Sequence, residues 1–308
     1  RLGWRQRPHE VNELQAAAAV GQMGLAQMYE TKLREQGLGS AQILLTHADL
    51  ADRERYLNAR TTLLTLFEHG VVPVINENDT VATHEIRFGD NDRLAALVAQ
   101  LVHADALFLL SDVDALYTDH PSKPQARRIC EVTGGEDLVG VDTSRTGSRV
   151  GTGGMTTKIQ AAGIATSAGI PVLVTAAANA AAALAGEDVG TRFTATGKRR
   201  PTRQLWLQHA SFAEGQLHLD TGAVQALLER KASLLPVGIT KVVGDFESGE
   251  PVNIIAPDGT VVARGLANFS STELRLVQGR SIAEIGQQFS PDLERVAVHR
   301  DVLAVLAQ

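Results

Sequence analysis

Along the first two thirds of the chain, stretches with apolar residues at helical spacing alternate with short, continuous apolar runs. The helical spacing predicts helices over residues 9–36, 52–68, 91–102 and 155–168. The apolar runs predict strands over residues 41–45, 71–76, 106–110 and 170–174. This alternation indicates an α/β fold with an open, mainly parallel sheet sandwiched by helices. Active-site loops are then expected at the carboxyl ends of the strands.

The last third of the chain has a different pattern. The segment GKRRPTR at about residues 197–203 is polar and basic, and it predicts a linker. Short strands separated by turn residues are expected beyond it, at 216–219, 239–246, 251–256 and 260–266. The sequence therefore predicts a catalytic domain over residues 1–200, followed by a linker and a small β-rich domain over residues 201–308.

Composition narrows the class of protein. A chain of 308 residues with 44% hydrophobic residues can bury a sizeable core, and no segment approaches the roughly 20 apolar residues of a membrane-spanning helix. One cysteine, Cys130, excludes an intrachain disulfide and a cysteine-based metal cluster. A net charge of -6 argues against a protein that binds mainly to phosphate backbones. We therefore expect a globular, cytoplasmic protein with no membrane partner.

Polar residues follow the strand predicted at 71–76. Asn76-Glu77-Asn78-Asp79 ends that strand, and Gly89-Asp90-Asn91-Asp92 opens the next helix. Carboxylates and carboxamides together could hold an ammonium group and a carboxylate, although the same residue types also serve as ordinary turns and helix caps. The pair of clusters around one loop favours a binding site.

Two further segments follow predicted strands or precede a helix. Ser111-Asp112 places a hydroxyl and a carboxylate at the end of an apolar strand, which by itself is also an ordinary polar cap. Gly151-Thr152-Gly153-Gly154 and Met155-Thr156-Thr157-Lys158 lead into a helix. Glycines allow a close approach, a helix start offers N–H groups, and lysine adds a positive charge, so this segment predicts a phosphate site unless it is only a flexible loop. Its spacing is not that of a Walker A loop.

Taken in this order, these segments resemble the amino acid kinase superfamily and, within it, the glutamate 5-kinase family. The similarity extends along nearly the whole chain. The motifs that carry it are AAVGQ at 18–22, QILLT at 42–46, DRERYLNAR at 52–60, VPVINENDTVAT at 72–83, FGDND at 88–92, ALYT at 115–118 and GTGGMTTK at 151–158.

The resemblance implies a role for each candidate residue. Asp79, Asn91 and Asn76 would bind glutamate, Lys158 and Asp90 would be catalytic, and Asn76 and Asp90 would shape the same loop. The nucleotide-binding residues that it implies are Ser111, Asp112, Thr152, Gly153, Gly154, Met155, Thr156, Thr157 and Lys158. No residue is assigned as a metal ligand.

The implied reaction is transfer of a phosphoryl group from ATP to the γ-carboxylate of L-glutamate, at the start of proline synthesis. A carboxylate is already an anionic nucleophile, so alignment and charge neutralisation are the protein's main tasks. Mg²⁺ would be held mainly through the ATP phosphates and water. The resemblance also implies feedback inhibition by L-proline, a homodimer or homotetramer, and a functional handover to glutamyl phosphate reductase.

Two features of the family pattern are missing. Family members begin with a strand that carries a phosphate-contacting lysine in a Lys-Leu-Gly-type turn, and a later Ser-Gly-Ala loop touches glutamate. Neither occurs in this sequence. We therefore expect the first domain to be incomplete at its N-terminal side, with the missing residues located upstream in the natural protein.

The second domain resembles a PUA module, a small β-rich fold found in RNA-modifying enzymes. The similarity rests on residues 222–239 and on VHRD at 298–301. Residues 201–308 contain nine Lys or Arg against twelve Asp or Glu, a net charge of -3, so RNA binding is not expected. Two alternatives stay open: a kinase of the same superfamily that acts on acetylglutamate, aspartate, carbamate or a nucleoside monophosphate, and an RNA-binding PUA protein.

Overall fold

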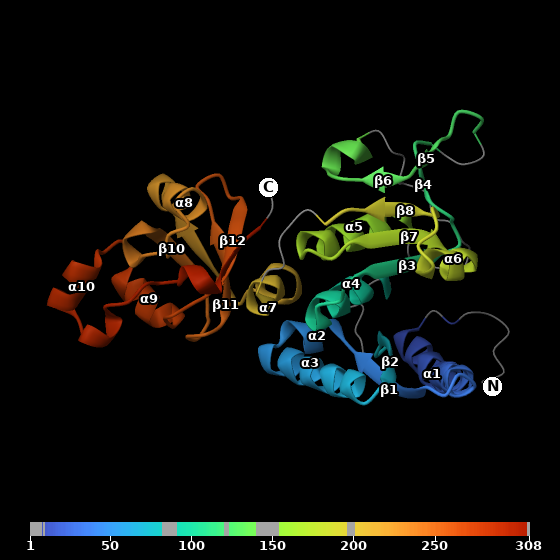
Figure 1. Cartoon of the computed structure of the whole chain (residues 1–308). Helices are drawn as coiled ribbons and strands as arrows, with labels where there is room; N and C mark the ends of the chain where they lie inside the picture. The colour runs from blue at the N-terminus through green and yellow to red at the C-terminus, as the bar shows by residue number, and fades with distance from the viewer. Residues whose placement is uncertain are drawn as a thin grey trace. The chain divides into compact units, whose positions relative to one another are not determined.

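The structure is a computed structural model that describes residues 8, 10–81, 91–119, 123–139, 154–195 and 201–306. The chain divides into two compact units, Arg1–Arg200 and Pro201–Gln308. Within the described residues, no helix is long and apolar enough to cross a membrane. Figure 1 shows the helices and strands of both units.

The first half of unit 1 is a parallel strand pair with helices. It contains α1 (Val11–Arg34), β1 (Gly39–Leu45), α2 (His47–Ala51), α3 (Arg53–Glu68) and β2 (Val71–Glu77). Strands β1 and β2 run parallel, in register from Gly39 opposite Val71 to Leu45 opposite Glu77. Helix α1 packs against β1 and α3 packs against β2 (Figure 1). The strand pair therefore carries the end of β2 to the same edge as the end of β1.

Local signals explain where these elements begin and end. Helix α2 begins with a capping box, in which the Thr46 hydroxyl accepts from the Asp49 N–H at 3.2 Å and the Asp49 carboxylate accepts from the Thr46 N–H at 2.8 Å. Asp52 caps α3 by accepting from the Arg55 N–H at 2.8 Å. Gly70, at a φ of +68°, follows α3 in the left-handed conformation that lets the chain turn into β2.

The second half of unit 1 contains the larger sheet. Its elements are α4 (Asn91–Val102), β3 (Leu107–Ser111), β4 (Leu116–Tyr117), β5 (Arg128–Ile129), β6 (Glu131–Val132), η1 (Gly135–Leu138), α5 (Met155–Ser167), β7 (Val172–Ala176), η2 (Ala177–Asn179), α6 (Ala180–Leu184) and β8 (Thr191–Phe193). The strand order within this sheet is β3-β7-β8-β6, which runs from bottom to top in Figure 1. Strands β4 and β5 form a separate antiparallel pair.

The strand directions agree with a mainly parallel sheet, with two differences in detail. The pairs β1–β2, β3–β7 and β6–β8 are parallel, whereas β7 and β8 are antiparallel. The strands also form separate sheets instead of one continuous sheet, because no strand among the described residues hydrogen-bonds to both β2 and β3. Short strands such as β8 were not expected, since three residues carry too little apolar pattern.

Helices α4 and α5 are packed together beside this sheet. Helix α4 buries one apolar face, and α5 presents small residues, Ala161, Ala162 and Ala165, that allow close approach. The Gln100 amide of α4 donates to the Ile164 carbonyl of α5 at 2.8 Å. This packing places the first turns of α4 and α5 next to each other, so that side chains of the two helices can meet there.

His47, the first residue of α2, is a buried titratable group outside the predicted site. Burial, and then the positive charge of Arg93, lower the pKa of His47 from 6.5 to about 4. The unfolded chain therefore takes up a proton near pH 6.5 that the folded chain accepts only near pH 4. The stability contributed by neutral His47 is complete above pH 6.5 and is lost as the pH falls towards 4.

We expect the urea midpoint of the protein to fall as the pH is lowered from 7 to 5, and to fall less in a His47→Gln variant, which cannot take up that proton. Urea unfolding at both pH values, with His69→Gln as a control at an exposed histidine, measures the difference. An equal decline in His47→Gln and in the unsubstituted protein would contradict this assignment.

Unit 2 is built on a five-stranded sheet. Its elements are α7 (Thr202–Leu205), the π-helical turn η3 (Trp206–Ala210), β9 (Gly215–Leu219), α8 (Thr221–Leu228), η4 (Pro236–Gly238), β10 (Ile239–Gly244), β11 (Pro251–Ile255), β12 (Val261–Leu266), α9 (Ser271–Val277), α10 (Ile282–Gln288), η5 (Pro291–Leu293), η6 (Arg300–Val302) and β13 (Leu303–Val305). The strand order is β10-β9-β11-β12-β13. The four strands predicted from the sequence correspond to β9, β10, β11 and β12.

One hydrophobic core holds unit 2 together. It joins the sheet to helices α8, α9 and α10 and includes Leu217, Ile254, Phe269 and Ile285, all fully buried. Arg264 of β12 also contributes, because its Nε donates to the Asn253 side chain at 2.9 Å and its Nη1 donates to the Ser211 carbonyl. Burial lowers the pKa of Arg264, because it removes water from around the charged guanidinium group.

Candidate active site

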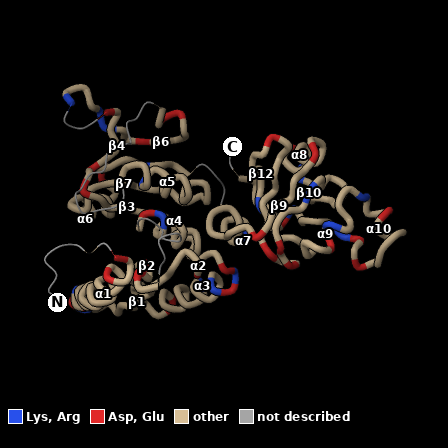
Figure 2. The backbone as a smooth tube through the Cα atoms, turned by 180° about the vertical axis from the view of Figure 1, so that it is seen from behind, with Lys and Arg blue, Asp and Glu red and all other residues tan. Residues whose placement is uncertain are grey.

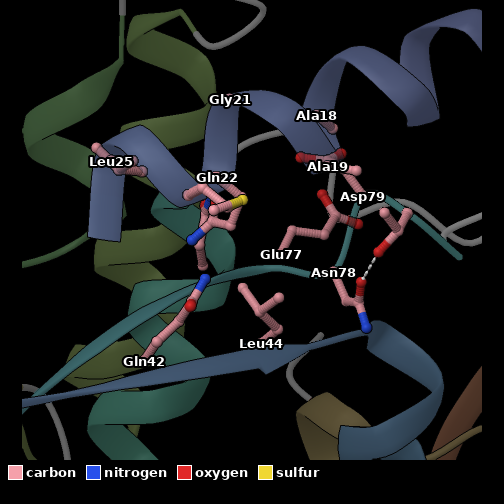
Figure 3. Close-up of a pocket in the computed structure, with 13 residues that line it drawn as sticks. Ala18, Ala19, Gly21, Gln22, Leu25, Gln42, Leu44, Glu77, Asn78 and Asp79 are labelled. Atoms are coloured by element: carbon pink, nitrogen blue, oxygen red, sulfur yellow. Dashed lines mark hydrogen bonds between the residues drawn. The ribbon is translucent and has the colours of Figure 1, made fainter. Parts of the chain in front are cut away.

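A cavity of about 460 Å³ lies between α1 and the ends of β1 and β2 (Figure 3). Three segments supply its walls. They are the middle of α1 (Ala18, Ala19, Gly21, Gln22, Met23 and Leu25), strand β1 (Gln42 and Leu44), and the end of β2 with the turn after it (Asn76, Glu77, Asn78, Asp79 and Thr80). The cavity therefore contains two of the predicted glutamate-binding residues, Asn76 and Asp79.

The turn after β2 is anchored to both strands. The Asn78 N–H donates to the Leu45 carbonyl at 2.9 Å, and the Thr80 hydroxyl donates to the Asn78 side chain. These bonds extend the β1–β2 edge by one turn. Figure 3 shows the side chains of Glu77 and Asp79 directed towards α1 beside Ala19. Two carboxylates thus face one end of the cavity.

Asn76 is held from α1. Its Nδ2 donates to Oε1 of Gln22 at 2.9 Å, across 54 residues of sequence. This bond joins the carboxyl end of β2 to the middle of α1 and orients the Asn76 amide beside the cavity. Gln22 was not expected among the site residues.

Lys158 and Asp92 form an ion pair at the starts of α5 and α4. The distance from Lys158 Nζ to Asp92 Oδ2 is 2.8 Å, and the two side chains are only 12% and 14% exposed. The Thr157 hydroxyl also lies 3.3 Å from the same carboxylate oxygen and 2.8 Å from the Gly154 carbonyl. Because the pair is shielded from solvent, it restricts the ammonium group to one position far more than a surface ion pair would.

Asp92 is therefore a candidate site residue, and in the sequence it had a place in the Gly89–Asp92 cluster but no role of its own. It stands directly after Asn91, in the GDND quartet that was expected to bind substrate. An acidic residue in the first turn of a predicted helix was visible in the sequence. Its partner, Lys158, lies 66 residues further along the chain. Only the packing of α4 against α5 brings the two together.

The start of α5 has the features expected of an anion site. Gly154 precedes the helix, and no side chain caps it. Gly154, as the N-cap residue, has no side chain with which to cap this 13-residue helix, and the first-turn N–H groups of a helix suit an anion. Met155, Thr156 and Thr157 form this first turn, with Lys158 at its end.

Ser111 and Asp112 lie at the carboxyl end of β3. The Ser111 hydroxyl donates to the Asp112 carboxylate at 3.0 Å, and Ser111 lies opposite Ala176 at the end of β7. The two residues are thus at the edge of the larger sheet where loops meet, as predicted from a strand followed by polar residues.

The candidate site residues within the described part of the chain form two groups. Asn76 and Asp79 share the cavity, while Lys158, Asp92 and Asn91 lie together at the starts of α4 and α5. The lining of the cavity beside β2 includes no residue of the second group, and it includes neither Ser111 nor Asp112. Three predicted site residues, Asp90, Thr152 and Gly153, lie outside the described residues.

Among the residues that the structure describes, no group of three or more His, Cys, Asp or Glu side chains could hold a metal ion. The Asp92 carboxylate, the acidic group nearest to Lys158, is already paired with that lysine.

Comparison with known proteins gives the family. A model described as the amino acid kinase family matches residues 2–176, and a model described as the PUA domain matches residues 215–287. A glutamate 5-kinase of Cutibacterium acnes is 53% identical over 304 residues, which are 99% of this chain and 78% of that protein. One of Thermobifida fusca is 53% identical over 307 residues, which are 99% of this chain and 79% of that protein.

A carbamate kinase from Giardia lamblia, solved bound to AMP-PNP, aligns with 60% of this chain and 78% of its own, with 19% identity and a TM-score of 0.44. That similarity is too low to indicate function. The curated relatives are far closer, and each matches both units of the chain. With an amino acid kinase model over more than half of its length and glutamate 5-kinases about half identical to it along almost all of it, the chain belongs to the glutamate 5-kinase family.

Proposed function

We propose that this chain performs the reaction of its family with the residues at the end of β2 and at the starts of α4 and α5. The reaction is ATP-dependent phosphorylation of the γ-carboxylate of L-glutamate, which yields L-glutamyl 5-phosphate and ADP in proline biosynthesis. The observation that carries the residue assignment is the shielded Lys158–Asp92 pair at the uncapped start of α5.

The cavity beside β2 suits the amino acid end of glutamate. Asp79 offers a carboxylate for the α-ammonium group, and the Asn76 amide, oriented by Gln22, offers a further polar contact. Charge-assisted hydrogen bonds of this kind are stronger than neutral ones, so they can set both affinity and orientation. Asn91, exposed at the start of α4, would contact the other end of the substrate.

The starts of α4 and α5 suit the phosphoryl group. A γ-carboxylate oxygen attacks the γ-phosphorus of ATP and forms the new P–O bond, while the bond to the β,γ-bridging oxygen breaks and ADP leaves with that electron pair. No general base is needed, because the nucleophile is already ionised. Lys158 and the first-turn N–H groups of α5 neutralise charge on the transferring oxygens. Asp92 positions the Lys158 ammonium group.

ATP is the phosphoryl donor, and Ser111, Asp112 and the segment Thr152 to Lys158 are the proposed nucleotide contacts. Asp90, for which we keep a catalytic role, and Thr152 and Gly153 lie outside the described residues. Mg²⁺, when bound through the ATP phosphates, would offset the negative charge of the triphosphate. The uncapped α5 start and the lysine at the end of its first turn are what favour a phosphate there.

An acceptor panel tests the substrate. ADP release coupled to NADH oxidation would be followed with L-glutamate, N-acetylglutamate, L-aspartate, carbamate and a nucleoside monophosphate as acceptors. We expect L-glutamate to have the highest kcat/KM by a factor of at least about 100. Each of the other acceptors lacks a free α-ammonium group or lacks a side-chain carboxylate at the same distance from it. A preference for any other acceptor would overturn the assignment of glutamate.

Regulation and assembly belong to the same proposal. L-Proline carries an α-carboxylate and an ammonium group in the same arrangement as glutamate, so it could occupy the cavity near Asp79 and act as a competing inhibitor. The proposal also includes a homodimer or homotetramer and a cytoplasmic location. The labile acyl phosphate would be handed over to glutamyl phosphate reductase. Inhibition by proline that glutamate relieves would support the shared site.

For the PUA domain, we propose a regulatory or oligomer-supporting role and no RNA partner. Its Lys and Arg residues are dispersed among a larger number of Asp and Glu residues (Figure 2). Neutralising several phosphates requires a basic surface. A gel shift with structured RNA at physiological salt should show no submicromolar binding. Such binding, found in a protein without ATP binding, would favour the alternative of an RNA-binding protein.

A further inference from the structure

The amide of Gln22 has an unused hydrogen-bond donor. Oε1 of Gln22 accepts from Asn76 Nδ2 at 2.9 Å, but Nε2 is buried and has no hydrogen-bond partner among the described residues. A buried amide donor without a partner costs free energy, so native proteins retain few of them, and those that persist often serve a ligand. Gln22 lines the cavity that holds Asp79, and the sequence analysis gave it no role.

The Gln22–Asn76 pair can serve two ligand groups at once. Each carboxamide has one NH₂ and one C=O, and the bond between them uses one of each. One NH₂ and one C=O therefore stay available, whichever way the two amides are oriented. If the only task of the pair were to join α1 to β2, an apolar contact would do so without leaving a donor unsatisfied. The remaining groups match a ligand that has both an acceptor and a donor.

The cavity also has two chemically different ends. Figure 3 shows Glu77 and Asp79 directed to one end and the amides of Gln22 and Gln42 at the other. The first end attracts an ammonium group, and the second offers neutral N–H donors that suit a carboxylate without a full positive charge. A cavity of about 460 Å³ has room for a small amino acid.

We propose that Gln22 is a specificity-determining residue, whose Nε2 donates to the α-carboxylate of glutamate while Asp79 holds the α-ammonium group. This rests on the proposed function, because the γ-carboxylate must face the phosphoryl group near Lys158. The α-carboxylate is then the acceptor that is left for the cavity. Gln22 thereby distinguishes amino acids from amines that lack an α-carboxylate.

The test compares Gln22→Met with Gln27→Met. Methionine keeps the length of glutamine and removes the donor, and Gln27 is an exposed residue of the same helix that does not line the cavity. In Gln22→Met we expect the glutamate KM to rise about 30-fold, as loss of a hydrogen bond to a charged group implies. The KM for ATP should stay within about twofold, since no nucleotide contact is lost.

An analogue separates recognition from a merely structural role. L-Isoglutamine keeps the γ-carboxylate and the ammonium group but has an amide in place of the α-carboxylate. The ratio of kcat/KM for glutamate to that for L-isoglutamine should fall at least about tenfold in Gln22→Met and should not change in Gln27→Met. Gln22→Glu should bind glutamate more weakly than Gln22→Met, because like charges repel.

The outcomes distinguish the two proposals. If the unsubstituted protein phosphorylates glutamate and Gln22→Met behaves like Gln27→Met, only the role of Gln22 is wrong. An equal loss with glutamate and L-isoglutamine also overturns it, since that result means a structural role for the Gln22–Asn76 bond. If the unsubstituted protein phosphorylates no glutamate, the proposed function itself fails. Thermal unfolding of each variant checks that the fold is retained.

Discussion

Replacing Lys158 by Met should lower kcat by about three orders of magnitude, with much smaller changes in both KM values. The Nζ atom lies 2.8 Å from Asp92 and its side chain is 12% exposed, so this ammonium group acts in a partly dry environment. There, a fixed positive charge next to the transferring oxygens stabilises the transition state more than water can. Steady-state kinetics with saturating glutamate and ATP measure the effect.

Two further variants sharpen this prediction. Lys123→Met removes a lysine from the exposed ion pair with Asp119, and it should leave kcat within about twofold, because surface pairs contribute little. Asp92→Asn keeps Lys158 and removes its partner charge, so we expect kcat to fall by about 10- to 100-fold, between the other two. A kcat for Lys158→Met within tenfold of the unsubstituted enzyme would exclude Lys158 from the phosphoryl site.

Replacing Asp79 by Ala should raise the glutamate KM by about 100-fold and leave the KM for ATP within about threefold. The Asp79 carboxylate lines the cavity at the end that faces α1, and it is the proposed partner of the α-ammonium group. Its loss leaves that ammonium group without a charge partner. Binding of glutamate is then weakened equally in the ground state and in the transition state, so KM rises. Initial rates over a matrix of both substrate concentrations separate the two KM values.

The matched control for Asp79 is Asp245→Ala, which removes an exposed carboxylate of unit 2 that pairs with Arg275. Neither KM should change in this variant. Asp79→Asn, which keeps the shape of the side chain and one acceptor oxygen, should lie between Asp79→Ala and the unsubstituted enzyme. Equal increases in both KM values for Asp79→Ala would show that Asp79 is not specific to the glutamate end of the site.

Much of the fold follows from local patterns. The helix predicted over 91–102 corresponds to α4 with the same bounds, and the predicted strands that correspond to β1, β2, β3 and β7 differ from the observed ones by at most two residues at either end. These elements were predictable because each has a strong apolar period, and because glycines mark the ends of some of them. Gly37 and Gly70, at φ of +74° and +68°, follow the two helices that precede β1 and β2.

Elements with little local pattern were missed. Helix α2 has only five residues, and its capping box reuses Thr46 and Asp49, which also suit a turn. Strands β4, β5 and β6 have two residues each, and β8 has three. Thr191 shows why β8 forms: its buried hydroxyl accepts from the Leu116 N–H at 2.8 Å and donates to the Ile129 carbonyl at 2.6 Å. Those partners are more than 60 residues away, beyond any local pattern.

The family and its reaction were also within reach of the sequence. The motifs NEND, GDND and GTGGMTTK each combine residue types suited to an amino acid or a phosphate, and the resemblance to glutamate 5-kinases that they carry is confirmed by relatives with 53% identity. The individual site residues stay predictions. Among them, Asn76 and Asp79 line one cavity of the described part of the chain.

The sequence by itself determined the α/β alternation, the motif residues and the family, because these depend on residue types and short spacings. The tertiary structure decided which side chains meet: Lys158 with Asp92 across 66 residues, and Asn76 with Gln22 across 54. It also decided the antiparallel direction of β8 beside β7. The physical reason is that such contacts depend on how helices and strands pack in space, and a hydrogen bond between distant residues leaves no periodic trace in either segment.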